Sequence, residues 1–446
     1  MYTGGIPVTD PAGFLLFFPA KRCILLPMEA ILNAILSTPS LSTLPQRIEE
    51  GLLPALITGT NGALRAAIAA ALHRKLGRPL VVVCPDEGSA GRFAGDLRAL
   101  CGEEPHRLLS RDLTLRQADV VSRQGEQGRL RVLDRLLQGA APLLVTTAQA
   151  LQQRTLPPEI LAGAAFTIHT DGPPIDTLEQ ELLRCGYRRC DLVEGSGQYA
   201  RRGDIVDIFS PGAERPLRVE YWGDEVDSMG LFDTDTQRRT ETVEEFRVLP
   251  AAEALPGLSP REPAALAREL RQFASHVSRR KEVGEQQSRA LREDAERIEQ
   301  GLSLPWADRY LPFLFPDYAT AVDYLPADAI ILIDSPGRCG ERGDELLGQL
   351  TSDCKLLTAS GLPMMTATDY ALPWAELCRR LNAFGVILGD AFAAGRYALP
   401  PKSLLNCDAR QLPSYAGSVE TAAEDVQHYL SLRYRVVLLS SDKHRM

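Results

Sequence analysis

The stretch ALITGTNGALRAAIAAALHRKLGRPLVVVC, residues 55–84, decides the fold class. It predicts, in order, an apolar strand over 55–58, a glycine turn, an alanine-rich helix over 63–76 ended by Gly77, and an apolar strand over 79–84. Two more apolar segments, 142–147 and 329–334, predict further strands. Strands that are apolar throughout and alternate with helices are typical of a parallel sheet covered on both faces. The sequence therefore predicts an α/β protein.

The glycine turn lies where a phosphate-binding loop belongs, directly after the first strand and at the start of a helix. Its candidate residues are Gly59, Thr60, Asn61 and Gly62. A working loop continues with a lysine for the phosphates and a hydroxyl for magnesium, whereas Ala63 and Leu64 stand here. The nearest cation, Arg65, is one turn further on and poorly placed. We therefore expect a degenerate loop.

A second nucleotide-binding element would be an acidic pair at the end of a buried strand. Asp334 ends the strand over 329–334, but Ser335 follows it in place of the carboxylate that would orient an attacking water. Because both elements are defective, we predict no ATP hydrolysis, no catalytic residue and no cofactor. The simplest interpretation is a turn that caps a helix, and passive nucleotide binding is the alternative.

The pattern changes after about residue 150. A short helix is predicted over 177–185, followed by two paired strands over 199–209 and 217–222, with a turn over 210–216 between them. In the second strand one set of side chains alternates with another, Leu217, Val219 and Tyr221 against Arg218, Glu220 and Trp222. This alternation predicts an antiparallel sheet with one solvated face, in a small inserted α+β domain.

Three polar groups invite functional interpretations that we weigh against simpler ones. Glu220, Asp224 and Glu225 resemble catalytic carboxylates, but a polar turn explains them better. The basic run 279–281 has the charge to contact DNA phosphate, but its acidic neighbours favour a solvated helix. Cys185 and Cys190 have no second pair or histidine cluster nearby, so no metal site is expected.

The C-terminal half predicts a long charged helical stretch over 263–302 and a second, small α/β domain from Leu356. In that domain a helix over 425–430 and a strand over 434–440 are expected, and the domain is expected to be truncated at Met446. At the other end, residues 1–27 form a doubtful extension, with Met28 the expected start and a short ordered arm the alternative.

Composition limits the class of protein. The chain has 446 residues and a net charge of −9, so contact with nucleic acid would need a local basic patch. No apolar run is long enough to span a membrane. Nine scattered cysteines indicate reduced thiols. We therefore predict a cytoplasmic protein with no membrane partner.

One long motif carries a specific family resemblance. The run GYRRCDLVEGSGQYARRGDIVDIF, residues 186–209, continues through PLRVEYWGDEVDSM, residues 216–229, and LFDTDTQRR, residues 231–239. It closely resembles the UvrB-like N-terminal module of the bacterial transcription-repair coupling factors (Mfd). The resemblance extends over residues 28–446.

The resemblance implies a helicase-like architecture. It places domain 1A over 28–147, a UvrA-binding domain 2 over 148–231, domain 1B over 232–345 and domain 3 over 355–446. A degenerate phosphate loop is typical of this family. The polymerase-binding domain, the translocase motor and the C-terminal regulatory domain have no counterpart here, nor does the hairpin with which UvrB grips DNA.

The resemblance also implies a partner. Its UvrA-binding residues fall on Arg188, Arg202, Phe209, Arg218 and Trp222, and arginine and aromatic residues concentrate binding energy at interfaces. The other interpretation is that Phe209 and Tyr221 are core and the arginines a solvated face. UvrA is the expected partner, with a weak DNA contact also considered. RNA polymerase is expected only through the missing downstream domain.

Together these features predict a non-catalytic docking module that recruits UvrA in transcription-coupled nucleotide excision repair. The alternatives are an ATP-dependent, UvrB-like DNA repair enzyme and a truncated gene fragment without an independent role. ATPase activity with DNA would favour the first alternative.

Overall fold

The computed structural model describes the backbone of most of the chain. The described residues are 14–17, 23–25, 28–113, 115, 123–278, 284–302, 304, 306–359, 365–393, 396–407, 412, 415, 417–434 and 436–439. Within these ranges, no helix is long and apolar enough to cross a bilayer.

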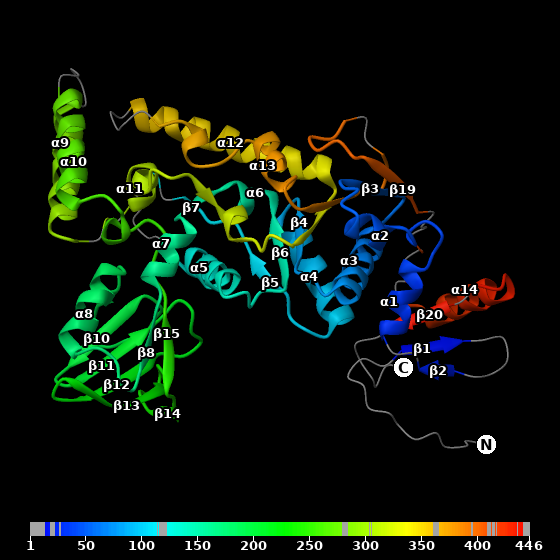
Figure 1. The fold of residues 1–446 in the computed structure, drawn as a ribbon, viewed down its shortest axis with the longest axis horizontal. Helices are drawn as coiled ribbons and strands as arrows, with labels where there is room; N and C mark the ends of the chain where they lie inside the picture. The colour runs from blue at the N-terminus through cyan, green and yellow to red at the C-terminus, as the bar shows by residue number, and fades with distance from the viewer. Residues whose placement is uncertain are drawn as a thin grey trace.

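A seven-stranded parallel sheet forms the centre of the molecule (Figure 1). Its strands, in spatial order, are β19 (Ser403–Asn406), β3 (Ala55–Thr58), β18 (Gly385–Gly389), β17 (Ile330–Asp334), β4 (Leu80–Cys84), β6 (Leu143–Thr147) and β5 (His106–Leu108). Ile331 pairs with Val81 on one side and Val386 on the other. The predicted parallel α/β sheet is therefore confirmed.

Helices cover both faces of this sheet, because alternate strand residues point to opposite sides. One face packs on α1 (Met28–Leu36), α2 (Leu44–Glu49), α3 (Gly62–Leu76) and α4 (Glu87–Cys101). The other packs on α5 (Gln124–Leu137), α6 (Ala148–Gln152), α7 (Pro158–Ala164), the start of α12 (Pro336–Ala359) and α13 (Trp374–Leu381). Val82 lies in the first core and Val81 in the second.

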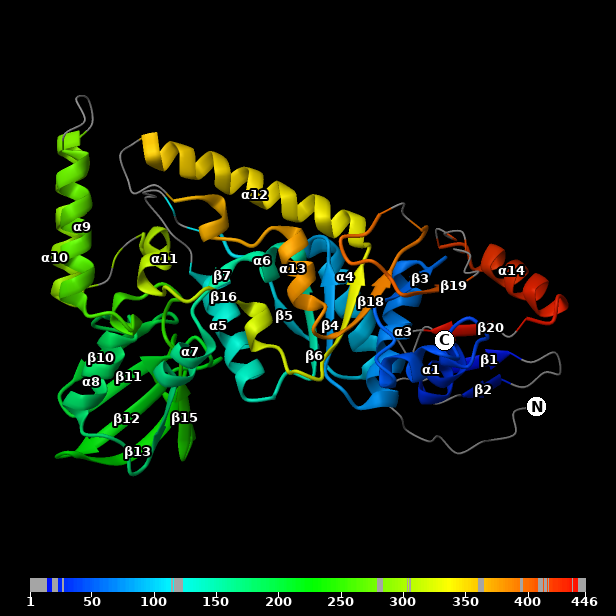
Figure 2. The ribbon, with the colours of Figure 1, turned by 45° about the horizontal axis from the view of Figure 1, so that its top comes forward.

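A separate six-stranded sheet forms the module at one end of the molecule (Figures 1 and 2). In spatial order its strands are β14 (Arg239–Thr242), β13 (Glu225–Phe232), β12 (Leu217–Trp222), β11 (Ile205–Phe209), β10 (Gln198–Arg202) and β9 (Arg188–Arg189). All neighbours are antiparallel except β9 and β10. Helix α8 (Ile175–Arg184) packs on one face, where Tyr199 Oη donates to Glu179 Oε1 at 3.0 Å.

This module differs from the prediction in two details. The single strand expected over 199–209 is a hairpin of β10 and β11, because Gly203, with φ of 62°, turns the chain. The sheet also continues past Leu231, since β13 ends at Phe232 and β14 follows it. Beside it, β8 (Phe166–His169) pairs with β15 (Glu245–Val248).

The expected long helical stretch is a hairpin of two helices. Helix α9 (Pro263–Val277) lies along α10 (Gly284–Glu299), and the pair projects from the body in Figure 2. An ion pair of 2.5 Å between Arg271 and Glu299 joins them. The basic run 279–281, considered for DNA contact, lies outside the described residues.

The region from Leu356, where a second small α/β domain was expected, contributes β18 and β19 to the main sheet. β18 and β19 pair with strands of the main sheet rather than with each other in a second one. Beyond them, α14 (Val419–Ser431) precedes β20 (Val436–Leu439), which pairs with β1 (Phe14–Phe17), itself paired with β2 (Cys23–Leu25).

Short elements complete the description. They are β7 (Arg154–Thr155), β16 (Ala319–Thr320), α11 (Leu311–Leu314) and the 3-10 helices η1 (Pro256–Leu258), η2 (Ala307–Tyr310), η3 (Ala321–Tyr324) and η4 (Ala367–Asp369).

Candidate functional site

The face of the six-stranded sheet that points away from α8 brings several predicted residues together. Strand register places Gln198 beside Arg188 and opposite Phe209, and Ala200 opposite Asp207. Asp207 in turn pairs with Arg218. Arg202 lies two residues beyond Ala200, so its side chain points to the same side. We call this surface, made of Arg188, Gln198, Arg202, Asp207, Phe209 and Arg218, the open face.

The predicted alternation in β12 is confirmed. Leu217, Val219 and Tyr221 are buried, whereas Arg218 and Glu220 are half-buried and Trp222 is exposed. Tyr221 Oη donates to the Pro173 carbonyl at 3.1 Å, so the core interpretation of Tyr221 is correct.

A buried carboxylate organises the centre of the open face. Asp207, with 1% of its side chain exposed, accepts hydrogen bonds from Arg202 Nη2 at 2.6 Å and from Arg218 Nε and Nη2 at 2.7 and 2.9 Å. The Arg218 guanidinium also lies 4.7 Å from the ring centroid of Phe232. The hydrogen bond to Asp207 raises the pKa of Arg218. A single carboxylate thus holds both cations.

The two cations differ in what they leave to solvent. The Arg202 side chain is 45% exposed, whereas that of Arg218 is 15% exposed. Arg202 therefore presents a tethered charge outward, while Arg218 faces inward and supports it. Arg202 is thus the more accessible of the two cations.

Arg188 lies on the edge strand β9, and Phe209 lies at the end of β11, in the same cross-strand row. Arg188 is exposed and has no ion pair among the residues that the structure describes. Phe209 is half-buried against Val193, Ala200 and Phe232. Phe209 thus packs against the core of the module, and part of its ring remains accessible to a partner.

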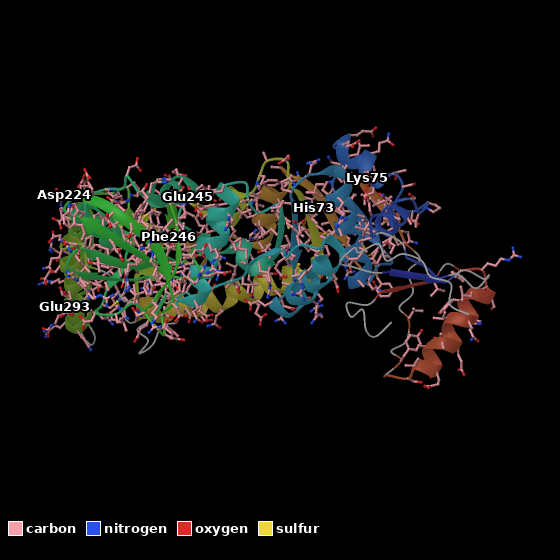
Figure 3. The ribbon with its side chains drawn as sticks, turned by 90° about the horizontal axis from the view of Figure 1, so that it is seen from below. His73, Lys75, Asp224, Glu245, Phe246 and Glu293 are labelled. Carbon is pink, nitrogen blue, oxygen red and sulfur yellow. The ribbon has the colours of Figure 1, made fainter. Side chains whose placement is uncertain are left out.

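Trp222 lies apart from this cluster. Its side chain is 83% exposed at the turn between β12 and β13, where Gly223 has φ of 64°. The neighbouring Asp224 lies at the left end of the molecule in Figure 3, far from His73 and Lys75. Glu220 instead accepts from Ser228 Oγ at 2.9 Å, and Asp224 and Glu225 are exposed. Glu220 thus lies on β12, Asp224 in the turn that follows, and Glu225 at the start of β13.

Other segments of the chain form hydrogen bonds with the start of the degenerate phosphate loop. Gly59 N donates to the Ala391 carbonyl at 3.0 Å and Thr60 N to the Asp390 carbonyl at 3.4 Å. Asn61 Oδ1 accepts from Leu64 N at 2.9 Å and so caps α3. A Cβ at Gly59, where φ is 68°, would lie 1.7 Å from the Cys407 carbonyl oxygen. The first two amides of the loop therefore already have partners within the chain.

Arg65 completes this closure, and sequence reasoning missed its role. Its Nε lies 2.6 Å from Asp334 Oδ1, and its Nη1 donates to the Thr60 carbonyl at 2.8 Å. The two side chains are 10% and 9% exposed. Burial raises the pKa of Asp334, and Arg65 opposes that rise. The sequence signal that could have revealed this role is an arginine among the buried alanines of α3, because a buried arginine needs a carboxylate or carbonyl partner. We call residues 59–65 with Asp334 the closed loop.

A buried ionic cluster joins the module to the main sheet, and it was also missed. Glu253, which is fully buried, lies 3.3 Å from Arg111 and 3.0 Å from Arg129. Arg111 Nη1 lies 2.7 Å from Asp308 and 3.7 Å from Glu126. Three carboxylates therefore face two arginines, and burial raises the pKa of Glu126 to about 7.

The two cysteines considered for a metal site have separate partners. Cys185 Sγ donates to the Ala164 carbonyl at 3.5 Å, and Cys190 Sγ to the Tyr199 carbonyl at 3.3 Å. Burial raises the pKa of Cys185 to about 11. Over the described ranges, no group of three or more His, Cys, Asp or Glu side chains is arranged so that it could hold a metal ion.

Comparison with known proteins gives this geometry a family context. Residues 171–253, which include all six strands of the module and Glu253, match the family model of the UvrB interaction domain. The transcription-repair-coupling factor of Bacillus subtilis (strain 168) is 26% identical over 94% of this chain and 36% of that protein. That of Myxococcus xanthus is 29% identical over 77% of this chain and 29% of that protein.

The Escherichia coli (strain K12) transcription-repair-coupling factor is 32% identical over 47% of this chain and 18% of that protein. The chain thus spans about a third or less of the length of these relatives. It is homologous to transcription-repair coupling factors over most of its own length, and it contains a UvrB interaction domain.

Proposed function

We propose that this chain is a non-catalytic, cytoplasmic docking module that binds UvrA in transcription-coupled nucleotide excision repair. In this proposal the open face is the binding surface, and the seven-stranded sheet is the scaffold that carries it. The observation that carries the proposal is Arg202, a half-exposed cation tethered to buried Asp207 within the UvrB interaction domain.

The chemistry of the open face supports this role. Arginines held in place lose less side-chain entropy on binding than free ones, and central arginines often dominate the binding energy of an interface. Arg188 supplies a second accessible cation, and Phe209 an aromatic ring beside it. A surface of this kind fits a partner that presents carboxylates, so binding should weaken as salt rises.

The closed loop supports the non-catalytic part of the proposal. Phosphate recognition requires free backbone amides and a cation aimed at the phosphates. Here the Gly59 and Thr60 amides and the Arg65 guanidinium are bound to other parts of the chain. We therefore expect neither ATP hydrolysis nor a nucleotide cofactor.

Calorimetric titration of purified UvrA into the chain tests the proposal. We expect micromolar or tighter binding, and Arg202→Ala should weaken it by about 2–4 kcal/mol. Arg201→Ala is the matched control. It is the next residue of β10, and its side chain pairs with Asp176 and Glu179 on the opposite face.

The wild-type titration and the variant answer different questions. No binding by the folded wild-type chain would refute the docking function. Binding that Arg201→Ala and Arg202→Ala weaken equally would refute the assignment of the open face.

A further inference from the structure

A cleft of about 820 Å³ opens beside the β9 edge of the module. Its walls come from the end of α8, the loop before β10, the start of α5 and the chain after α10. The residues that concern its binding properties are Arg123, Leu183, Arg184, Arg188, Glu194 and Leu302. Its volume is in the range of sites that enclose a ligand or a short peptide segment.

The cleft is basic, in a chain whose net charge is −9. Arg123, Arg184 and Arg188 enter it from three different elements, and Glu194 is the one carboxylate among its described lining residues. Arg184 pairs with Glu181 at 2.7 Å, but the two side chains are 38% and 41% exposed. Surface pairs of this kind are weak, so Arg184 can exchange its partner at low cost.

The rim of the cleft is also apolar. Leu183 is 50% exposed and Leu302 47% exposed, and both line the cleft. Exposed leucines gathered next to arginines are typical of protein–protein contact surfaces. The cleft therefore favours a polypeptide that carries both acidic and apolar side chains.

The cleft is continuous with the open face. Arg188, Gln198 and Phe209 belong to both surfaces. A protein that covers the open face therefore reaches the mouth of the cleft without a break.

From this continuity and charge, we propose that an acidic segment of the protein bound on the open face extends into the cleft. There its carboxylates contact Arg123 and Arg184, and its apolar side chains contact Leu183 and Leu302. This inference rests on the proposed docking function and assigns it a second contact region, between the module and the body.

The test uses the double variant Arg184→Glu with Leu302→Ser, because neither residue belongs to the open face. The matched control is Arg98→Glu with Leu52→Ser. Arg98 is also an exposed arginine in the last turn of its helix with a glutamate beside it, and Leu52 is 49% exposed. Both control residues lie on the main-sheet part of the chain.

With UvrA as the titrant, we expect the cleft variant to bind about tenfold more weakly, and the control within about twofold of wild type. Photo-crosslinking from position 302 should capture a UvrA segment rich in aspartate or glutamate.

Three results would overturn the inference. Wild-type binding that Arg202→Ala weakens, but the cleft variant leaves intact, would refute the cleft while the docking function stands. Absence of wild-type binding would remove both. A labelled DNA duplex is titrated in parallel. If the cleft variant loses binding to that duplex while its binding to UvrA is unchanged, the cleft is assigned to nucleic acid instead.

Discussion

The closed loop and the open face both contain an ion pair between arginine and a buried aspartate, but the two pairs differ in how much of the arginine is exposed. In the closed loop, Arg65 and Asp334 form a buried ion pair next to the degenerate phosphate loop. In the open face, Asp207 is also buried, but it binds two arginines and leaves Arg202 about half exposed. The exposed fraction of the arginine therefore decides its role. A buried arginine stabilises the fold, whereas a half-exposed one can also contact a partner.

The comparison predicts separable effects. Variants in the closed loop should change stability and leave binding unchanged, whereas variants at Arg202 should change binding with little effect on stability. The following variants test this separation, from the largest expected effect to the smallest.

Arg65→Ala should lower the free energy of unfolding by about 3 kcal/mol, because it leaves the Asp334 carboxyl buried without its cation. Urea denaturation followed by circular dichroism would measure the loss. Replacing both partners, with Arg65→Met and Asp334→Leu, should cost less than the single change. UvrA affinity should stay at its wild-type value, and a loss of affinity in the folded variant would contradict the proposed separation.

Arg218→Ala should weaken UvrA binding by about 2 kcal/mol, although Arg218 itself is mostly buried. The variant removes two of the three hydrogen bonds to Asp207, so Asp207 no longer holds Arg202 in one position. Arg218→Lys should rescue binding only in part, because an ammonium cannot make the forked contact. Full rescue by lysine, in the same calorimetric titration, would show that charge alone is required.

The buried ionic cluster around Glu253 and Arg111 offers a pH-dependent comparison with both regions. Glu126 ionises near pH 4.5 when unfolded and near pH 7 when folded, so its contribution to stability is complete below pH 4.5 and is lost as pH rises through about 7. The free energy of unfolding should therefore fall by up to about 1.4 kcal/mol per pH unit within this window. Glu126→Gln should flatten that slope in urea denaturation, and an unchanged slope would mean that another group causes it.

Trp222→Ala should have the smallest effect. Because Trp222 is 83% exposed at a turn away from Asp207, we expect a loss of UvrA affinity of about 1 kcal/mol or less and a change in stability within about 0.5 kcal/mol. A loss as large as that of Arg202→Ala would move the centre of the interface to the β12–β13 turn.

Local patterns predicted the elements of both regions. The apolar runs predicted four strands of the main sheet, and the alternation from Leu217 to Trp222 identified the solvated face of the module. What the sequence could not predict are contacts between distant positions. Arg65 meets Asp334, and Glu253 meets Arg111, only because the fold brings their elements together.

The same limit applies to the C-terminal half. Strand β18 reads like the start of a second α/β unit, since its apolar pattern does not reveal its neighbours. In the structure it lies between β3 and β17, where its register with Ile331 fixes it in the main sheet.

Amide hydrogen exchange of the chain with and without UvrA tests the central claim most directly, because one measurement covers both regions. We predict slower exchange on binding in peptides that span residues 186–209, and unchanged exchange in peptides that span residues 59–65. Protection of the closed loop without protection of the open face would contradict the account.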